Sequence, residues 1–207
     1  MSAALDLGWT HLFRPAQTPG ASTLLLLHGT GGDEHSLLPL AQAAAPDRAV
    51  LSVRGRSLEE GSPRFFRRLG SLSFDQDQIR SEAAALAEFL RGASVAYSLD
   101  PARITALGYS NGANIGLAVL LLHPGALSGA ALLRPVAALR PQPQADLSGK
   151  RLLTLQGRRD PYFAAGVEIA PHATSLGAEV TAHVQDAGHE LIQADVALLS
   201  AWLAAEG

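Results

Sequence analysis

The segment ITALGYSNGANIGLAVLLL, residues 104–122, is the strongest indication of the fold because it joins an apolar, β-rich run directly to an apolar, helix-like run. Within it, residues 108–112 have the form G-x-S-x-G. A sharp strand-to-helix turn of this form holds its serine in a strained backbone conformation, and side chains two residues to either side would clash. We therefore predict a strand over residues 104–108, a tight turn at Ser110 and a helix over residues 111–123.

Around this corner, short β-rich runs alternate with longer segments rich in alanine and leucine, a pattern typical of parallel strands joined by helices. The predicted strands are residues 22–27, 49–53, 104–108, 128–133, 151–156 and 179–185, and the predicted helices are residues 36–45, 76–91, 111–123, 166–176 and 191–205. Uninterrupted runs such as TLLLL and RLLTL suit strands that are covered on both faces. The expected fold is a single three-layer α/β domain over residues 1–207, with helices on both faces of a mostly parallel sheet.

The composition limits which partners and which cellular compartment we expect for this protein. The 207 residues are 47% hydrophobic and 17% charged, with a net charge of -3 and no cysteine. We therefore expect no nucleic-acid partner, no disulfide and no thiolate chemistry. The N-terminus has no basic region followed by an apolar run, and no apolar stretch approaches the roughly 20 residues of a membrane span. We expect a soluble cytoplasmic protein without membrane contact.

Ligands bind to open α/β sheets outside the carboxyl ends of the strands, so we expect the chemistry in the loops that follow strands. Ser110 lies in such a loop, where the turn lifts its Oγ clear of the sheet. The N–H groups of the helix that begins at Asn111 point at the same place and favour the negative charge of an acyl-transfer intermediate. We interpret Ser110 as a nucleophile; the alternative is an ordinary glycine-rich turn.

A serine hydroxyl is a weak nucleophile until a base takes its proton, so this hypothesis requires a histidine at another strand end. His189 lies in DAGHEL, between the last predicted strand and the C-terminal helix, and is the candidate. His183 lies within the alternating strand VTAHV, where we expect a half-buried or solvent-facing side chain. His172 follows Pro171 in a predicted helix and is expected at the surface.

An acid must in turn orient the histidine, and in this architecture the chain order is Ser, then Asp or Glu, then His. Asp160 in QGRRDPYF follows the strand RLLTLQ and precedes Pro161, so it is the candidate. Asp186 is the alternative, but it is so close to His189 on the same loop that it would struggle to approach the ring from the far side. We predict that Asp186 caps the turn instead.

The loop HGTGGD, residues 28–33, follows the first strong strand, the position from which this architecture supplies a backbone donor to an oxyanion. We choose Thr30 for this donor, with Gly31 as the alternative, and the N–H of Asn111 for the second donor. His28 precedes the glycines and is expected to be structural rather than a base. The loop lacks a G-K-[ST] ending and the G-x-G-x-x-G spacing, so a phosphate-binding loop is not predicted.

The interval from Arg54 to Asp75 is the one long segment without clear periodicity. Long irregular loops of compact domains are often functional. Phe65 and Phe66 either line or cover a pocket, or they lie in the core beneath a surface turn. The interval also carries the arginines Arg54, Arg56, Arg64, Arg67 and Arg68. Their positive charge favours an acidic or polar leaving group, unless these arginines are simply solvated.

Together, LLLLHGTGGDE, GYSNGANI, QGRRDPYF and DAGHEL resemble the α/β-hydrolases of the phospholipase/carboxylesterase family, which includes acyl-protein thioesterase-like enzymes. The resemblance spans nearly the full length, and GYSNGANI is similar to a bacterial carboxylesterase branch. It implies an α/β-hydrolase fold, a triad of Ser110, Asp160 and His189, esterase activity on short acyl esters and, often, a dimer. Better-characterised thioesterase relatives carry GFSQG, but the donor at Asn111 is its backbone N–H, so the oxyanion role is expected to survive this difference.

The length of the chain leaves no room for an inserted lid domain, so we expect an open and shallow site. The leading hypothesis is a serine carboxylesterase that hydrolyses small or short-acyl esters without a cofactor or a metal. One alternative is an acyl thioesterase or lysophospholipase that acts on longer acyl chains. Another is a small-molecule binding protein that kept the hydrolase scaffold without its activity.

Overall fold

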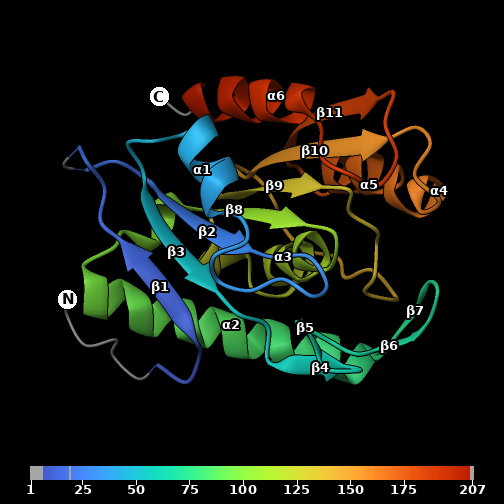
Figure 1. Cartoon of the computed structure of the whole chain (residues 1–207), viewed down its shortest axis with the longest axis horizontal. Coiled ribbons are helices and arrows are strands. Elements are labelled where there is room, and N and C mark those ends of the chain that lie inside the picture. Colours follow the sequence, from blue (N-terminus) through green and yellow to red (C-terminus); the bar gives the residue numbers. More distant parts are fainter. Residues whose placement is uncertain (1–6, 19, 206–207) are drawn as a thin grey trace.

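The computed structural model describes residues 7–18 and 20–205, and within them the chain forms a seven-stranded sheet in the order β1-β3-β2-β8-β9-β10-β11 (Figure 1). The strands are β1 (His11–Arg14), β2 (Thr23–Leu27), β3 (Ala49–Val53), β8 (Ile104–Tyr109), β9 (Gly129–Leu133), β10 (Arg151–Gly157) and β11 (Glu179–Gln185). All neighbours pair in parallel except β1, which is antiparallel to β3. The mostly parallel sheet is therefore confirmed, and β1 is an edge strand that the sequence analysis did not predict.

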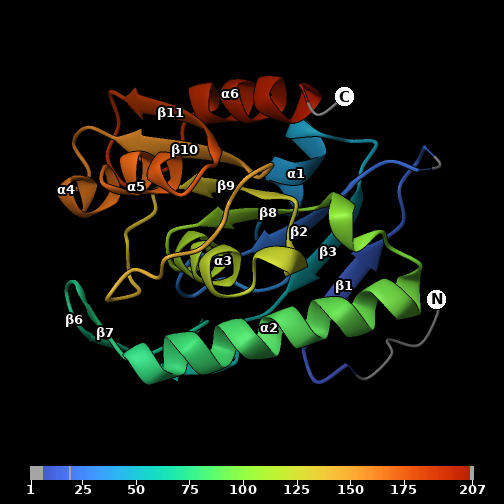
Figure 2. The same cartoon turned by 180° about the vertical axis from the view of Figure 1, so that it is seen from behind.

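Helices cover both faces of this sheet, as predicted (Figures 1 and 2). One face carries α1 (Leu38–Ala44) and α6 (Gln193–Ala204). The other face carries α2 (Gln76–Tyr97), α3 (Asn111–Leu122), α4 (Phe163–Gly166) and α5 (Ile169–Ser175). Two short 3-10 turns, Pro101–Arg103 and Pro124–Ala126, complete the connections.

Strand β2 shows why uninterrupted apolar runs mark central strands. Successive side chains of a strand point to opposite faces. Leu25 and Leu27 accordingly lie in the core under α2 and α3, whereas Leu24 and Leu26 lie in the core under α1 and α6. Because both faces are covered, neither set of positions can be polar.

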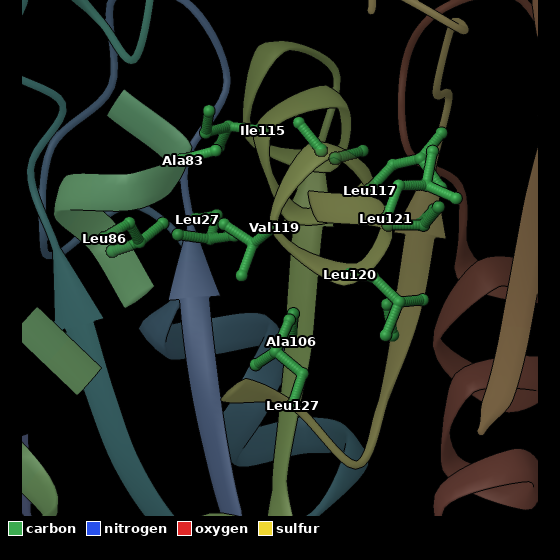
Figure 3. Packing of buried hydrophobic residues seen from close by; sticks show 14 of the residues in the cluster. Leu27, Ala83, Leu86, Ala106, Ile115, Leu117, Val119, Leu120, Leu121 and Leu127 are labelled. Atoms are coloured by element: carbon green, nitrogen blue, oxygen red, sulfur yellow. The ribbon is translucent and has the colours of Figure 1, made fainter. Parts of the chain in front are cut away.

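Helix α3 is apolar nearly all round because it lies between the sheet and α2. Every residue from Asn111 to Leu121 is buried. Val119 of α3, Leu86 of α2 and Leu27 of β2 point toward one another in the same cluster (Figure 3). A helix that is packed on all sides needs no polar stripe, so its position in the core explains the sequence ANIGLAVLLL.

Two predicted helices differ from the observed ones. The helix expected over residues 166–176 is divided into α4 and α5, which are both short. Helix α2 continues to Tyr97, beyond the predicted end at residue 91, and stops at Ser98 in a left-handed conformation with φ of 55°. The residue before its first turn is Asp75, whose side chain accepts a hydrogen bond from the Gln78 N–H and so caps the helix.

The interval from Arg54 to Asp75 is not an irregular loop, which corrects the expectation from its lack of periodicity. It folds into the hairpins β4 (Ser57–Glu59) with β5 (Ser62–Arg64) and β6 (Arg68–Gly70) with β7 (Ser73–Phe74). Glu60 and Gly61 both have positive φ, as a tight two-residue hairpin turn requires. Both hairpins lie near the beginning of α2 (Figure 1).

Phe65 and Phe66 link the two hairpins and are completely buried. Phe65 packs near Trp9 and His28, and Phe66 packs edge-on against Phe74. The core alternative for these aromatics is therefore confirmed.

Among the described residues, no helix is long and apolar enough to cross a membrane.

Candidate active site

The turn after β8 has the strained geometry that the G-x-S-x-G pattern predicts. Ser110 has φ of 52° and ψ of −117°, a conformation that residues with a side chain rarely adopt. A Cβ on Gly108 would lie 2.6 Å from the Cα of Ala113, and one on Gly112 would lie 1.9 Å from the carbonyl oxygen of Leu27. Both glycines are thus required by close backbone approach, and this prediction is confirmed.

Three side chains from distant parts of the chain meet in loops that follow strands of the sheet: Ser110 after β8, Asp160 after β10 and His189 after β11. His189 Nε2 lies 2.9 Å from Ser110 Oγ, and His189 Nδ1 lies 2.7 Å from Asp160 Oδ2. The other oxygen of Asp160 accepts the Tyr162 N–H at 2.8 Å, and this aspartate is only 5% exposed. Because a carboxylate only accepts, the partners place a proton on Nδ1 and leave Nε2 to accept from the serine.

Two tyrosine rings lie close to the histidine ring. The rings of Tyr109 and Tyr162 each lie 5.5 Å from the His189 ring, centroid to centroid. The Tyr109 hydroxyl also donates to the backbone carbonyl of His189 at 3.0 Å. Burial raises the pKa of the Tyr109 phenol, so this donor keeps its proton at neutral pH.

Arg134, which the sequence analysis did not single out, clamps the loop that carries His189. Its Nε donates to the Gly188 carbonyl at 3.1 Å and its Nη2 donates to the Glu190 carbonyl at 2.9 Å, one residue on either side of the histidine. The guanidinium also makes a two-point pair with Asp195 of α6, at 2.7 and 3.0 Å, and donates to the Leu155 carbonyl at 3.2 Å.

The Arg134–Asp195 pair is completely buried, with both side chains 0% exposed. The five hydrogen bonds of Arg134 use all the donors that a guanidinium has, so the charge is buried without an unsatisfied N–H. Asp195 also accepts the N–H of Ile192 at the start of α6. The only sequence signal for this clamp is a charged residue directly after an apolar strand, in LLRPV.

The loop after β2 offers backbone donors beside Ser110. The Gly31 N–H donates to the Pro63 carbonyl at 2.9 Å, so the alternative oxyanion donor is already engaged. The Thr30 N–H has no acceptor among the described residues, and Thr30 lines the cavity at Ser110. Asn111 is the first residue of α3, where a backbone N–H has no acceptor within the helix.

His28 is structural, as predicted. Its Nε2 accepts the Gly55 N–H at 2.9 Å, so the ring proton is on Nδ1, which lies 2.6 Å from the Gly29 carbonyl. Burial lowers the pKa of His28 below its ordinary value, although the Gly29 carbonyl opposes this shift. The neutral ring thus ties the loop after β2 to the loop after β3.

The residues that were considered as alternatives to Asp160 and His189 do not contact Ser110. Asp186 forms an exposed ion pair with Arg159, so its expected role as a turn cap is wrong. His183 is half-buried on β11, which confirms the prediction. His172 is half-buried in α5 rather than at the surface. Within the described parts of the chain, no three His, Asp or Glu side chains are grouped as a metal site would need.

A small cavity of about 50 Å³ opens beside Ser110. Its walls come from the turn at Ser110 and Asn111, from His189 and from the hairpin region, which contributes Arg64, Arg68, Ser71, Leu72 and Phe74. A neighbouring cavity of about 340 Å³ shares Leu72, Phe74 and Val136 with it. These three apolar side chains therefore form the wall between the two spaces.

The chain is similar to known proteins over nearly its whole length. A carboxylesterase of Bacillus cereus is 39% identical, with a TM-score of 0.92 over 95% of this chain and 94% of that chain. A carboxylesterase from Mesorhizobium loti is 38% identical, with a TM-score of 0.91 over 96% of each chain. The protein "Putative hydrolase MhqD" of Bacillus subtilis (strain 168) is 36% identical over 183 residues, which cover 87% of this chain and 92% of that protein. No family model matches.

Fold and similarity together define an enzyme of the α/β-hydrolase class. The chain belongs to the phospholipase/carboxylesterase family of these hydrolases, which includes acyl-protein thioesterase-like enzymes.

Proposed function

We propose that this hydrolase is a carboxylesterase that cleaves small or short-acyl esters through an acyl-enzyme on Ser110. The observation that carries the proposal is the continuous hydrogen-bond chain from Asp160 Oδ2 through His189 to Ser110 Oγ, with distances of 2.7 and 2.9 Å. A base in contact with a hydroxyl, itself oriented by a buried acid, is the arrangement that activates a serine. The carboxylesterases among its relatives support the same reaction class.

In the first half of the reaction, Ser110 Oγ attacks the ester carbonyl carbon while His189 Nε2 takes the serine proton. Asp160 stabilises the imidazolium that forms. When the carbon–oxygen bond of the ester breaks, His189 gives the proton to the departing alcohol oxygen. In the second half, His189 takes a proton from water, the hydroxide attacks the acyl group, and the proton returns to Ser110 as the acid leaves.

The oxyanion of each tetrahedral intermediate is stabilised by the backbone N–H groups of Thr30 and Asn111. Thr30 is preferred over Gly31 because the Gly31 N–H is bonded to the Pro63 carbonyl. The Asn111 N–H lies at the beginning of α3, where the helix dipole adds positive potential.

The size of the cavity supports a short acyl group. Pockets for drug-sized ligands enclose roughly 300–1,000 Å³, whereas the space beside Ser110 is about 50 Å³. The neighbouring cavity of about 340 Å³ favours a second candidate, an acyl thioesterase or lysophospholipase with a longer acyl chain. A series of 4-nitrophenyl esters of increasing acyl length separates the two, because a rate maximum at long chains would favour the second candidate.

The Ser110→Ala variant tests the mechanism. It should lower kcat for 4-nitrophenyl acetate by on the order of 10⁶-fold, since loss of the nucleophile removes the acyl-enzyme route. It should also abolish covalent labelling by a fluorophosphonate probe. The control is an unchanged thermal unfolding transition; a folded Ser110→Ala variant that still turns over the ester by the wild-type kinetics would refute the proposal.

A further inference from the structure

The cavity beside Ser110 carries hydrogen-bond donors without matching acceptors. The Asn111 side chain is 2% exposed, and its Oδ1 accepts the Phe65 N–H at 2.8 Å. This bond fixes the orientation of the amide, and the buried Nδ2 has no partner in the described structure. One turn along α3, the Oδ1 of Asn114 is engaged in the same way, because it accepts the Val136 N–H at 2.8 Å. Both asparagines line the cavity, and the acceptor oxygens of both side chains are already engaged.

The charged side chains that line the cavity are positive, so they suit the same kind of ligand as these donors. Among the described residues that line it are Arg64, Arg68 and Arg134, and none of the lining residues is acidic. Arg134 is neutralised by Asp195. Arg64, whose side chain is 3% exposed, and Arg68 share the single carboxylate of Glu59. Two guanidinium groups with one carboxylate leave one positive charge in excess at Arg64 and Arg68. The other carboxylate near the cavity, Asp160, is paired with His189 rather than with these arginines.

The remaining arginines of the hairpin region are paired away from the cavity. Arg54 binds Glu34, Arg56 binds Glu82, and Arg67 binds Asp75. None of these three lines the cavity among the residues described. The excess positive charge is thus a local property of Arg64 and Arg68 rather than of the whole segment.

We propose that the cavity binds an acyl group that ends in a carboxylate, so that the preferred substrates are half-esters of short dicarboxylic acids. This inference rests on the proposed esterase function. His189 returns its proton to the leaving alcohol, which places the alcohol on the histidine side and leaves the rest of the cavity for the acyl group. Leu72, Phe74 and Val136 contact the methylene groups, and the guanidinium and amide donors receive the carboxylate.

The experiment compares monomethyl succinate with methyl butyrate, whose acyl groups differ only in a terminal carboxylate or methyl group. Release of methanol gives kcat/KM for both substrates with the same leaving group. Wild-type enzyme should prefer the half-ester by roughly tenfold or more, the worth of hydrogen bonds to a charged group. Succinate should likewise inhibit more strongly than butyrate.

The Asn111→Asp variant keeps the backbone N–H and the acceptor for Phe65 but replaces the Nδ2 donor with an oxygen. It should lower the ratio of kcat/KM for monomethyl succinate to kcat/KM for methyl butyrate by roughly 10- to 100-fold. Arg68→Gln should lower it by about 2- to 5-fold, because this arginine is partly exposed. The matched control is Arg67→Gln, which removes the same charge from the adjacent position and should leave the ratio within about twofold.

Equal or lower activity of wild-type enzyme on the half-ester, with methyl butyrate still hydrolysed, would overturn this inference and leave the esterase proposal standing. Equal losses in Arg68→Gln and Arg67→Gln would also overturn it, because the preference would then reflect overall charge. If neither ester is cleaved and no fluorophosphonate label is found, the esterase proposal itself fails. Arg68 is partly exposed, so we expect Arg68→Gln to fold. This variant therefore still tests the inference if Asn111→Asp does not fold.

Discussion

At the scale of single residues, close backbone contacts determine which residues can flank Ser110 in its turn. Gly112 lies where a Cβ would meet the backbone oxygens of Leu27 and His28 at 1.9 and 2.5 Å. Backbone atoms cannot rotate away as the end of a side chain can. Ser110 therefore keeps its positive φ only because its neighbours at 108 and 112 have no side chains.

We expect Gly112→Ala to destabilise the protein by about 3 kcal/mol or more, because β2 and α3 must move apart to admit the methyl group. Urea unfolding measures this change. The matched control is Gly116→Ala in the same helix, where the Cβ would meet side chains rather than backbone, the nearest being the end of the Leu27 side chain at 3.1 Å. Equal stability losses in the two variants would contradict the backbone-contact explanation.

At the scale of elements, the loop between β11 and α6 is held by a residue from a different loop. Arg134 follows β9, yet it donates to the carbonyls on both sides of His189 and pairs with Asp195 of α6. It adopts φ of 52°, an unusual conformation for a residue with a side chain. The position of the histidine thus depends on contacts among three elements.

Removal of the guanidinium by Arg134→Met should cost about 3–5 kcal/mol, because it leaves the Asp195 carboxylate buried without its partner. It should also lower kcat by about 100-fold through displacement of His189, with a smaller change in KM. The double variant Arg134→Met/Asp195→Leu should recover stability but not kcat. If the double variant instead recovers both stability and kcat, Arg134 has only a structural role.

The exposed ion pair between Arg91 and Glu88 on α2 provides the control for this prediction. Both of its side chains are more than half exposed. Arg91→Met should change stability by less than about 1 kcal/mol and leave kcat unchanged, because water replaces the lost partner.

At the scale of the whole molecule, the buried neutral His28 couples folding to pH. Burial holds its pKa in the folded protein below the value of 6.5 that it has in the unfolded chain. The unfolded chain therefore binds a proton more readily as the pH falls. The stability contributed by His28 is fully present above pH 6.5 and is lost as the pH falls toward the folded-state pKa.

The free energy of unfolding should accordingly decrease between pH 7.5 and 5.5, with a slope from this one group of at most about 1.4 kcal/mol per pH unit. His28→Gln keeps an acceptor for the Gly55 N–H and a donor for the Gly29 carbonyl but does not titrate. Urea unfolding across this range should give a shallower pH dependence for the variant. Identical slopes would exclude His28 as the source.

Local pattern determined much of this protein. Stretches of a few residues, through their periodicity and turn chemistry, predicted three features. These are the alternation of apolar strands with helices, the glycine-flanked turn at Ser110, and the strand-end positions of Asp160 and His189. Sequence patterns did not predict the edge strand β1, the hairpins that line the cavity, or the pairing of Arg134 with Asp195. These features depend on which distant segments the chain topology brings together, and a buried charge shows its partner only once that packing exists.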